Sequence, residues 1–158
     1  MVNQSAGILL YRFREGQLEF LLVHPGGTYW RNKDAAAWTI PKGEFGEDEA
    51  PLAAARREFA EETGMALDGD FLELTPIRQK GGKLVYAFAL EAEIDPAQIK
   101  SNTFEMEWPP RSGKRVEFPE VDQAAWFGLV EAQEKINPAQ AELLRELLAR
   151  LLGGSRAA

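Results

Sequence analysis

Two segments near the N-terminus have the apolar and aromatic pattern of β-strands. Residues 5–13, "SAGILLYRF", and residues 18–25, "LEFLLVHP", are separated by "REGQ", a turn that contains Gly16. We therefore expect a β-hairpin or two neighbouring strands. The segment that follows is polar and irregular, and "WTIPKGE" then predicts a short strand that stops at Pro41, because proline cannot donate a ladder hydrogen bond.

The strongest helical pattern, "LAAARREFAEET", lies between Pro51 and Gly64. Proline suits the first turn, where its missing N–H would be unpaired, and glycine suits the end of a helix. A second helix is predicted from "NPAQAELLRELLARLL", with Asn137 as its cap and Pro138 at its start. Its leucines form one apolar stripe, namely Leu143, Leu144, Leu147, Leu148, Leu151 and Leu152.

Between these helices the pattern changes from strand to loop. "FLELTPIRQ" and "KLVYAFALEAEI" flank the turn "KGGK" and predict two more strands. Residues 95–119 are rich in proline, and we expect a loop-rich insertion with one short strand around "NTFEMEW". Because no repeat or linker interrupts the chain, we expect one domain over residues 1–153 and a frayed C-terminal tail over residues 154–158.

Composition narrows the chemistry. The 158 residues carry 18 Lys and Arg against 25 Asp and Glu, a net charge of −7, so the footprint of a duplex nucleic-acid binder is missing. No apolar run approaches the roughly 20 residues that cross a bilayer, and no basic leader begins the chain, so we expect a cytoplasmic protein without a membrane partner. With no cysteine and only His24, thiolate nucleophiles and zinc sites rich in cysteine or histidine are excluded.

Acidic residues concentrate in and before the first predicted helix. Glu58, Glu61 and Glu62 stand at i, i+3 and i+4, so their side chains gather on one helix face beside the apolar stripe. Most acidic helix faces are simply solvated. Alternatively, the three carboxylates form an all-oxygen site for Mg²⁺ or Mn²⁺, hard cations that prefer carboxylate ligands and keep waters for a substrate phosphate.

The residues around this cluster favour the second alternative. From Gly43 to Met65 the chain reads G-x5-E-x7-R-E-F-x-E-E-x-G-M, which resembles the Nudix box of the Nudix hydrolase family at every charged position. Phe59 and Met65 stand where smaller aliphatic residues are more usual, and neither change removes a ligand. The resemblance implies an α/β fold, a single-domain αβα sandwich with a mixed β-sheet between helices.

The resemblance also implies roles for the box residues. Glu58, Glu61 and Glu62 would ligate Mg²⁺ or Mn²⁺, and Gly43 would add its carbonyl oxygen. Arg57 would orient a ligand carboxylate, and the alternative for this arginine is an exposed i,i+4 partner of Glu61. The remaining box carboxylate, Glu49, would support the site.

A general base is harder to assign. The first candidate is Glu120, because its spacing from Trp126 resembles that in the family branch that hydrolyses diadenosine polyphosphates. Its rivals are Glu105, Glu107 and Glu117 in the same insertion, and Glu62 in the box.

Substrate contacts are expected outside the box. "WTIPKGE" resembles the lead-in of relatives that act on dinucleoside polyphosphates and inositol pyrophosphates, with Lys42 at the mouth of the box. Candidate phosphate contacts are Lys42, Arg78, Lys80 and Lys83, and candidate base-stacking residues are Tyr86, Phe88 and Trp108. For Phe88, core packing is the favoured alternative. Likewise, His24 is expected to be a hydrogen-bonded histidine at a strand end.

These features together predict a Mg²⁺-dependent hydrolase that cleaves a phosphoanhydride bond in a nucleoside diphosphate-linked small molecule, most readily a dinucleoside polyphosphate. One alternative is a nucleoside triphosphate pyrophosphohydrolase that removes damaged nucleotides. Another, from a different class, is a non-catalytic nucleotide-binding regulatory module. ADP-ribose is less favoured because Pro76 lies too close to the box to match that branch. A monomer or homodimer is expected.

Overall fold

The computed structural model describes the backbone of residues 3–157 and the side chains of residues 3–153. In chain order its elements are β1 (Gln4–Arg14), β2 (Gln17–Pro25), β3 (Lys42–Glu44), α1 (Pro51–Thr63), β4 (Leu72–Glu73), β5 (Ile77–Arg78), the 3-10 helix η1 (Lys80–Gly82), β6 (Leu84–Glu91), η2 (Pro96–Gln98), β7 (Thr103–Glu107), β8 (Arg115–Pro119), β9 (Val121–Gly128), α2 (Leu129–Lys135), η3 (Pro138–Gln140) and α3 (Ala141–Ala157).

Seven strands form one mixed sheet. Its path is β4-β6-β1-β2-β9, with β3 added to β1 and β5 added to β6. Strand β1 runs parallel to β6 and antiparallel to β2, and β2 pairs antiparallel with β9 at the edge. The predicted hairpin of β1 and β2 is confirmed, and the residues of its tight turn, Glu15 and Gly16, both have positive φ.

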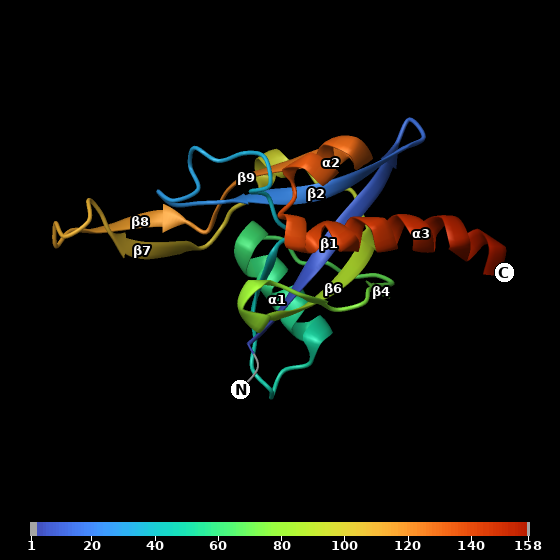
Figure 1. Cartoon of the computed structure of the whole chain (residues 1–158), viewed down its shortest axis with the longest axis horizontal. Coiled ribbons are helices and arrows are strands. Elements are labelled where there is room, and N and C mark those ends of the chain that lie inside the picture. Colours follow the sequence, from blue (N-terminus) through green and yellow to red (C-terminus); the bar gives the residue numbers. More distant parts are fainter. Residues whose placement is uncertain (1–2, 158) are drawn as a thin grey trace.

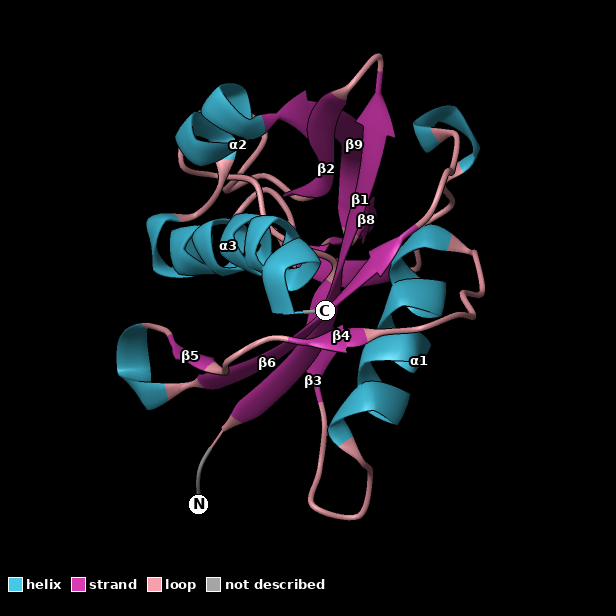
Figure 2. Ribbon diagram, turned by 90° about the vertical axis from the view of Figure 1, so that its right-hand side faces the viewer, coloured by secondary structure: helices cyan, strands magenta, loops and turns pink. Residues whose placement is uncertain are grey.

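Helices cover both faces of this sheet, with α1 on one side and α2 and α3 on the other (Figure 2). On the α1 side, Ile8 and Leu10 pack with Phe59. On the other side, Leu9 packs with residues of α2 and α3 such as Leu143. Because β1 is buried on both faces, its sequence is a nearly continuous apolar run and does not alternate. The predicted αβα sandwich with a mixed sheet is confirmed.

Helix α1 begins and ends where the sequence indicates. Pro51 occupies its first turn, and Gly64 closes it in the left-handed conformation with φ 76°. The N–H of Gly64 donates to the carbonyl of Ala60 at 2.8 Å. Ala55 and Phe59 are fully buried against the sheet, which fixes the face that the carboxylates of the helix present.

The expectation of a loop-rich insertion over residues 95–119 is wrong in part. Strand β7 is the predicted short strand, but it pairs with a second strand, β8, that was not expected. The two form a separate antiparallel hairpin that extends away from the main sheet (Figure 1). In β8, Val116 and Phe118 alternate with charged residues, and this short alternation was obscured by the surrounding prolines.

Two other strands differ from their predicted bounds, in each case at a proline. The strand expected to stop at Pro41 instead begins after it, as β3, although Trp38 and Thr39 still make isolated bridges. Pro41 joins the sheet as an acceptor, because its carbonyl takes the N–H of Ile8 at 3.1 Å. In "FLELTPIRQ", Pro76 divides one predicted strand into β4 and β5.

At the C-terminus, Asn137 caps as predicted, its Oδ1 accepting the Ala139 N–H at 2.9 Å. The turn that follows is a 3-10 helix, so α3 begins at Ala141 and not at Pro138. The backbone of α3 continues to Ala157, into the segment expected to fray, while the side chains of residues 154–157 and all of residue 158 lie outside the described residues. Within the described chain, no helix has the length and apolar content to cross a membrane.

Candidate active site

Arg57 organises the carboxylates of the predicted box. Its Nε and Nη2 donate to the two oxygens of Glu49, each at 2.9 Å. Its Nη1 donates to Glu58 Oε2 at 2.7 Å and to Glu61 Oε2 at 3.1 Å. The hydrogen bonds between Arg57 and Glu49 raise the pKa of the guanidinium and lower the pKa of the carboxyl. Arg57 therefore ties the loop before α1 to two carboxylates of the helix, and is more than an i,i+4 partner of Glu61.

Glu58 and Glu62 lie on the buried side of this cluster. Both residues are buried, and the side chain of Glu58 is 11% exposed, whereas that of Glu61 is 41% exposed. Burial, together with the charges of Glu120 and Glu58, raises the pKa of Glu62 to about 8. Burial also raises the pKa of Glu58, against the opposing effect of Arg57. Glu58 and Glu62 therefore repel each other in a partly desolvated place, and the exposed Glu120 lies near enough to add its charge.

Gly43 permits this crowding. A Cβ built on Gly43 would lie 1.9 Å from Glu58 Oε1, so no side chain fits there without moving the glutamate. Strand β3 holds the backbone of Gly43 in place by pairing with β1, where Gly43 stands opposite Ala6. The glycine of the box thus lets the backbone of β3 approach the buried carboxylate of Glu58.

The donor set suits a hard divalent cation. All candidate ligands are oxygens, and the raised pKa values of Glu58 and Glu62 show that this place disfavours two unscreened carboxylates, which a bound cation would stabilise in their ionised form. Among the described residues, no three carboxylates or imidazoles are already arranged so that they could hold a metal ion together. Mg²⁺ does not require such an arrangement, because it is commonly held by one or two carboxylates and keeps several waters.

Comparison with known proteins identifies the family. The family model for the NUDIX domain matches residues 1–147. The chain belongs to the Nudix family. Enzymes of this family are pyrophosphohydrolases that act on phosphorus-containing anhydrides, and they generally use divalent metal cations. No curated protein matches the chain.

Solved structures share the fold at low sequence identity. The NUDIX domain of Shewanella oneidensis NrtR, complexed with ADP ribose, is 16% identical with a TM-score of 0.67, over 96% of this chain and 89% of that one. A C. elegans Ap4A hydrolase is 24% identical with a TM-score of 0.65, over 96% and 99%. A structure reported for MutT of Aliivibrio salmonicida and Vibrio cholerae is 14% identical with a TM-score of 0.54, over 93% and 96%.

The raised pKa of Glu62 predicts that the affinity of this site for a divalent cation depends on pH. An ordinary glutamate ionises near pH 4.5, so the metal-free fold loses stability from this group as pH rises from there through about 8. A cation must displace the retained proton. We expect Mg²⁺ to raise Tm more at about pH 9 than at about pH 6, measured by thermal melts. Glu62→Gln should reduce that difference, because only Glu58 then keeps a raised pKa, and the exposed-residue control Glu47→Gln should keep it in full. Equal Mg²⁺ shifts at both pH values in the wild-type chain would contradict the assignment.

The candidate phosphate contacts occupy different environments. Lys42 lies close enough to Glu62, Glu58 and Lys83 for their charges to act on it, and burial lowers its pKa. Lys83 pairs with Glu44 at 3.1 Å. Arg78 is exposed on β5, where its Nη1 donates to the Gly82 carbonyl at 3.4 Å, and Lys80 is exposed in η1. The structure therefore brings Lys42 beside the box carboxylates.

The candidate stacking residues are also separated. Phe88 is 6% exposed and belongs to the core on the α1 side, as the favoured alternative predicted. Tyr86 packs edge-to-face on Phe45 at a centroid distance of 5.8 Å in the same region. Trp108 lies at the end of β7, with the Arg31 guanidinium 5.7 Å from its ring centroid. Tyr86 and Trp108 therefore lie in different parts of the molecule.

The candidate bases are separated by the hairpin. Glu105 and Glu117 face each other across β7 and β8 on exposed positions, and Glu107 accepts N–H groups of the hairpin tip. Glu120 instead follows the hairpin at the root. Its N–H donates to Asn102 at 2.8 Å, and the Asn102 N–H donates to the carbonyl of Glu61 at 3.0 Å. Glu120 is thus tied to the box end of α1, next to Glu62.

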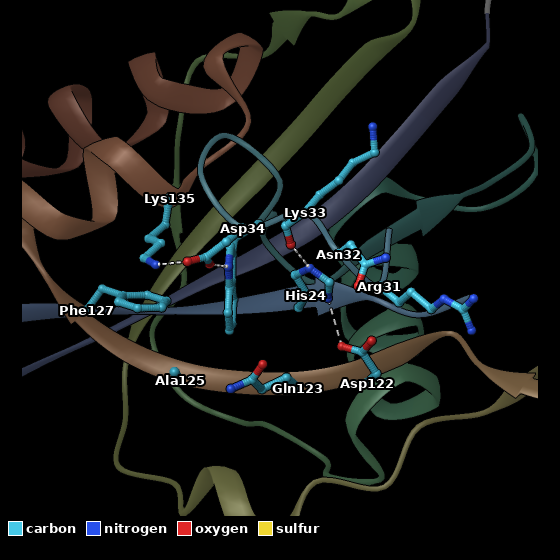
Figure 3. A pocket seen from close by; sticks show the side chains of 11 residues that line it. His24, Arg31, Asn32, Lys33, Asp34, Asp122, Gln123, Ala125, Phe127 and Lys135 are labelled. Atoms are coloured by element: carbon cyan, nitrogen blue, oxygen red, sulfur yellow. Dashed lines mark hydrogen bonds and ion pairs between the residues drawn. The ribbon is translucent and has the colours of Figure 1, made fainter. Parts of the chain in front are cut away.

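A cavity lined by polar residues, outside the box, was not predicted from the sequence. A cavity of about 700 Å³ lies on the β2–β9 pair, on the face opposite α1, and Asp122, Gln123, Arg31 and Asn32 help to line it (Figure 3). His24 forms its wall, with Nδ1 2.8 Å from Asp122 Oδ1 and Nε2 2.6 Å from the Lys33 carbonyl. The expectation of a hydrogen-bonded histidine is confirmed. The cavity itself had no sequence signal, because its lining comes from a loop and a distant strand.

Proposed function

We propose that this Nudix protein is a Mg²⁺- or Mn²⁺-dependent hydrolase that cleaves a phosphoanhydride bond in a nucleoside diphosphate-linked compound, with a dinucleoside polyphosphate favoured. One observation carries the proposal: the carboxylates of Glu58 and Glu62 are buried beside each other on α1, Glu58 is bound by Arg57, and the exposed carboxylate of Glu120 lies close enough for its charge to act on both. Such an excess of negative charge suits a divalent cation bound together with a polyphosphate. A cytoplasmic location forms part of the proposal.

The box residues would hold the cation. Glu58, Glu61 and Glu62 are its proposed ligands, together with the carbonyl oxygen of Gly43. When bound, the cation supplies positive charge to the non-bridging and leaving oxygens of the phosphates. Arg57 keeps two of the ligand carboxylates oriented, and Glu49 holds Arg57 from the other side.

Two residues beside the box would act on the reactants. A water oxygen forms a bond to phosphorus, the bridging P–O bond breaks, and the departing nucleotide phosphate keeps the bond electrons. Glu120 accepts the proton of the attacking water. Lys42, placed near Glu58 and Glu62, contacts a phosphate oxygen of the substrate. Arg78, Tyr86 and Trp108 remain candidate contacts for the rest of the molecule.

The surroundings of the box support a substrate longer than a simple triphosphate. The loop after β2 packs on the hairpin, where Thr28 Oγ1 donates to the sulfur of Met106 at 3.8 Å and Arg31 lies over Trp108. Loop and hairpin thus form one wall that continues from the root at Glu120. A wall of this size suits a second nucleotide beyond the cleaved bond.

A substrate panel tests the proposal. Purified protein with Mg²⁺ is incubated with diadenosine polyphosphates, canonical and oxidised nucleoside triphosphates, ADP-ribose and diphosphoinositol phosphates, and the products are separated by chromatography. We expect ATP with AMP, or two molecules of ADP, from diadenosine tetraphosphate. Preference for a triphosphate with release of pyrophosphate would instead establish the nucleotide-pool alternative. Binding without turnover of any compound would establish the non-catalytic alternative and overturn the proposal.

A further inference from the structure

Glu120 lies at the junction between the β7–β8 hairpin and the main sheet. It follows Pro119, the last residue of β8, and precedes Val121, the first residue of β9. Glu120 is exposed, yet its carboxylate lies close enough to Glu58 and Glu62 for its charge to act on both. Like charges repel, so a freely rotating main chain at residue 120 would let this carboxylate turn away from the box.

Three hydrogen bonds restrain the main chain at this junction. The Glu120 N–H donates to the Asn102 carbonyl at 2.8 Å, and the Glu120 carbonyl accepts the N–H of Gly26 at 2.9 Å. The Val121 N–H donates to the Oγ of Ser101 at 2.9 Å. These groups belong to the two planar peptide units on either side of the Glu120 Cα, so the bonds restrain both of its backbone dihedral angles. The direction in which the Glu120 side chain leaves the backbone follows from them.

The hydroxyl of Ser101 is the side-chain group in this set of three bonds. Besides accepting the Val121 N–H, it donates to the Asn102 carbonyl at 2.6 Å, which is the carbonyl that also accepts the Glu120 N–H. A hydroxyl can take both roles because it has one donor and two acceptor lone pairs. Alanine at position 101 would leave the N–H of the buried Val121 without this acceptor. The peptide unit after Glu120 would then be held from one side.

The segment that carries Ser101 is itself bound to the box end of α1. The Lys100 N–H donates to the Thr63 carbonyl at 2.8 Å, and the Asn102 N–H donates to the Glu61 carbonyl at 3.0 Å. Ser101 lies between these two anchors, so its hydroxyl connects the helix of the box to the start of β9. Such a connection matters for catalysis, because misplacement of a reacting group by about 1 Å can slow a reaction by about 10²-fold.

We propose that Ser101 is a positioning residue, which holds the carboxylate of Glu120 beside the box by fixing the Val121 N–H. The inference rests on the proposed function, in which Glu120 accepts the proton of the attacking water. Ser101 contacts neither the substrate nor the cation in this account, and acts only through residue 120. Its loss should therefore slow bond cleavage and leave substrate binding unchanged.

Steady-state kinetics with diadenosine tetraphosphate and Mg²⁺ test this role. Ser101→Ala should lower kcat by about tenfold with KM unchanged, whereas Ser101→Thr, which keeps the hydroxyl, should retain most of the turnover. Ser112→Ala is the matched control and should keep wild-type kcat. Its hydroxyl also accepts a main-chain N–H, that of Lys114 at 3.1 Å, but at the far tip of the hairpin.

A double variant separates positioning from a general loss of structure. In the Glu120→Gln background, Ser101→Ala should cause no further loss of kcat, because a residue that acts through the Glu120 carboxylate then has no base to position. A purely structural role would lower the residual kcat of Glu120→Gln by the same tenfold. That result would overturn the inference. Thermal melts check that every variant folds.

Amide hydrogen exchange followed by NMR adds a measurement that needs no turnover. The Val121 N–H should exchange faster in Ser101→Ala than in the wild-type chain, and unchanged exchange would overturn the inference. Wild-type kcat in Ser101→Ala, or an equal loss in Ser112→Ala, would do the same. Slow turnover by Glu120→Gln with wild-type turnover by Ser101→Ala would overturn this inference alone, whereas absence of hydrolysis by the wild-type chain would overturn the proposed function with it.

Discussion

Glu62→Gln should lower kcat for diadenosine tetraphosphate by about 10³-fold, which corresponds to about 4 kcal/mol of lost transition-state stabilisation. The amide has nearly the same shape, so its burial beside Glu58 is retained while the ionisable oxygen donor is removed. Steady-state turnover in saturating Mg²⁺ measures the effect. Because the variant also removes a buried carboxyl that repels Glu58 and Glu120, its metal-free Tm at about pH 9 should be no lower than that of the wild-type chain.

Glu47 provides the matched control for this prediction. It lies in the loop of the same box, is exposed, and occupies a position at which the box pattern requires no particular residue. Glu47→Gln should retain wild-type kcat. Equal activities of Glu62→Gln and Glu47→Gln would show that the buried carboxylate of α1 has no part in the reaction.

Glu120→Gln should reduce turnover by about 10² to 10⁴-fold while the Mg²⁺-dependent rise in Tm persists. The expected reason is the loss of a proton acceptor at the root of the hairpin, where backbone hydrogen bonds to Asn102 and Gly26 hold residue 120 in place. These bonds involve only the main chain of residue 120, so the amide variant should keep them. Rate measurements with melts in the presence and absence of Mg²⁺ separate the two effects.

Glu117→Gln tests the alternative position in the same experiment. Glu117 is exposed on β8 and faces Glu105, away from the contacts that tie Glu120 to α1. Its variant should retain wild-type turnover. A large loss in Glu117→Gln with normal turnover in Glu120→Gln would transfer the proposed base to the hairpin.

The box and its helix could be predicted because every signal is local. Helical spacing places Glu58, Glu61 and Glu62 together, and Pro51 and Gly64 mark the two ends of α1. The same spacing does not distinguish the buried from the exposed carboxylates. That difference depends on β3 and on Gly43, which lies against Glu58 only once β3 has paired with β1.

Strands that contain proline or are short were predicted less well. Pro41 and Pro76 end strand-like segments in the sequence, yet Pro41 keeps a carbonyl that accepts a hydrogen bond in the sheet. Phe118 of β8 lies beside Phe104 of β7, and Phe104 in turn lies against Gly27 in the loop after β2. Such a hairpin is stabilised by contacts distant in sequence, which periodicity does not reveal.

The cavity is the feature that depends most on the tertiary structure, because its residues are brought together only in the folded chain. Asn32 belongs to a loop with no regular pattern. Gln123 belongs to the edge strand β9, where its sequence position looks like an ordinary exposed polar residue. They line one space because β2 and β9 pair and because His24 is held by both Asp122 and the Lys33 carbonyl. No spacing rule in the sequence connects these residues.

The most direct test of the central claim is hydrolysis of diadenosine tetraphosphate in H₂¹⁸O, with the products analysed by mass spectrometry. The account predicts one ¹⁸O atom in the terminal phosphate of one product nucleotide, formed in the presence of Mg²⁺ by the wild-type chain and reduced about 10³-fold in Glu62→Gln. The labelled product also identifies the phosphorus that water attacks. No label in any product, or equal labelling by the wild-type chain and Glu62→Gln, would contradict the assignment of this site as a Mg²⁺-dependent phosphoanhydride hydrolase.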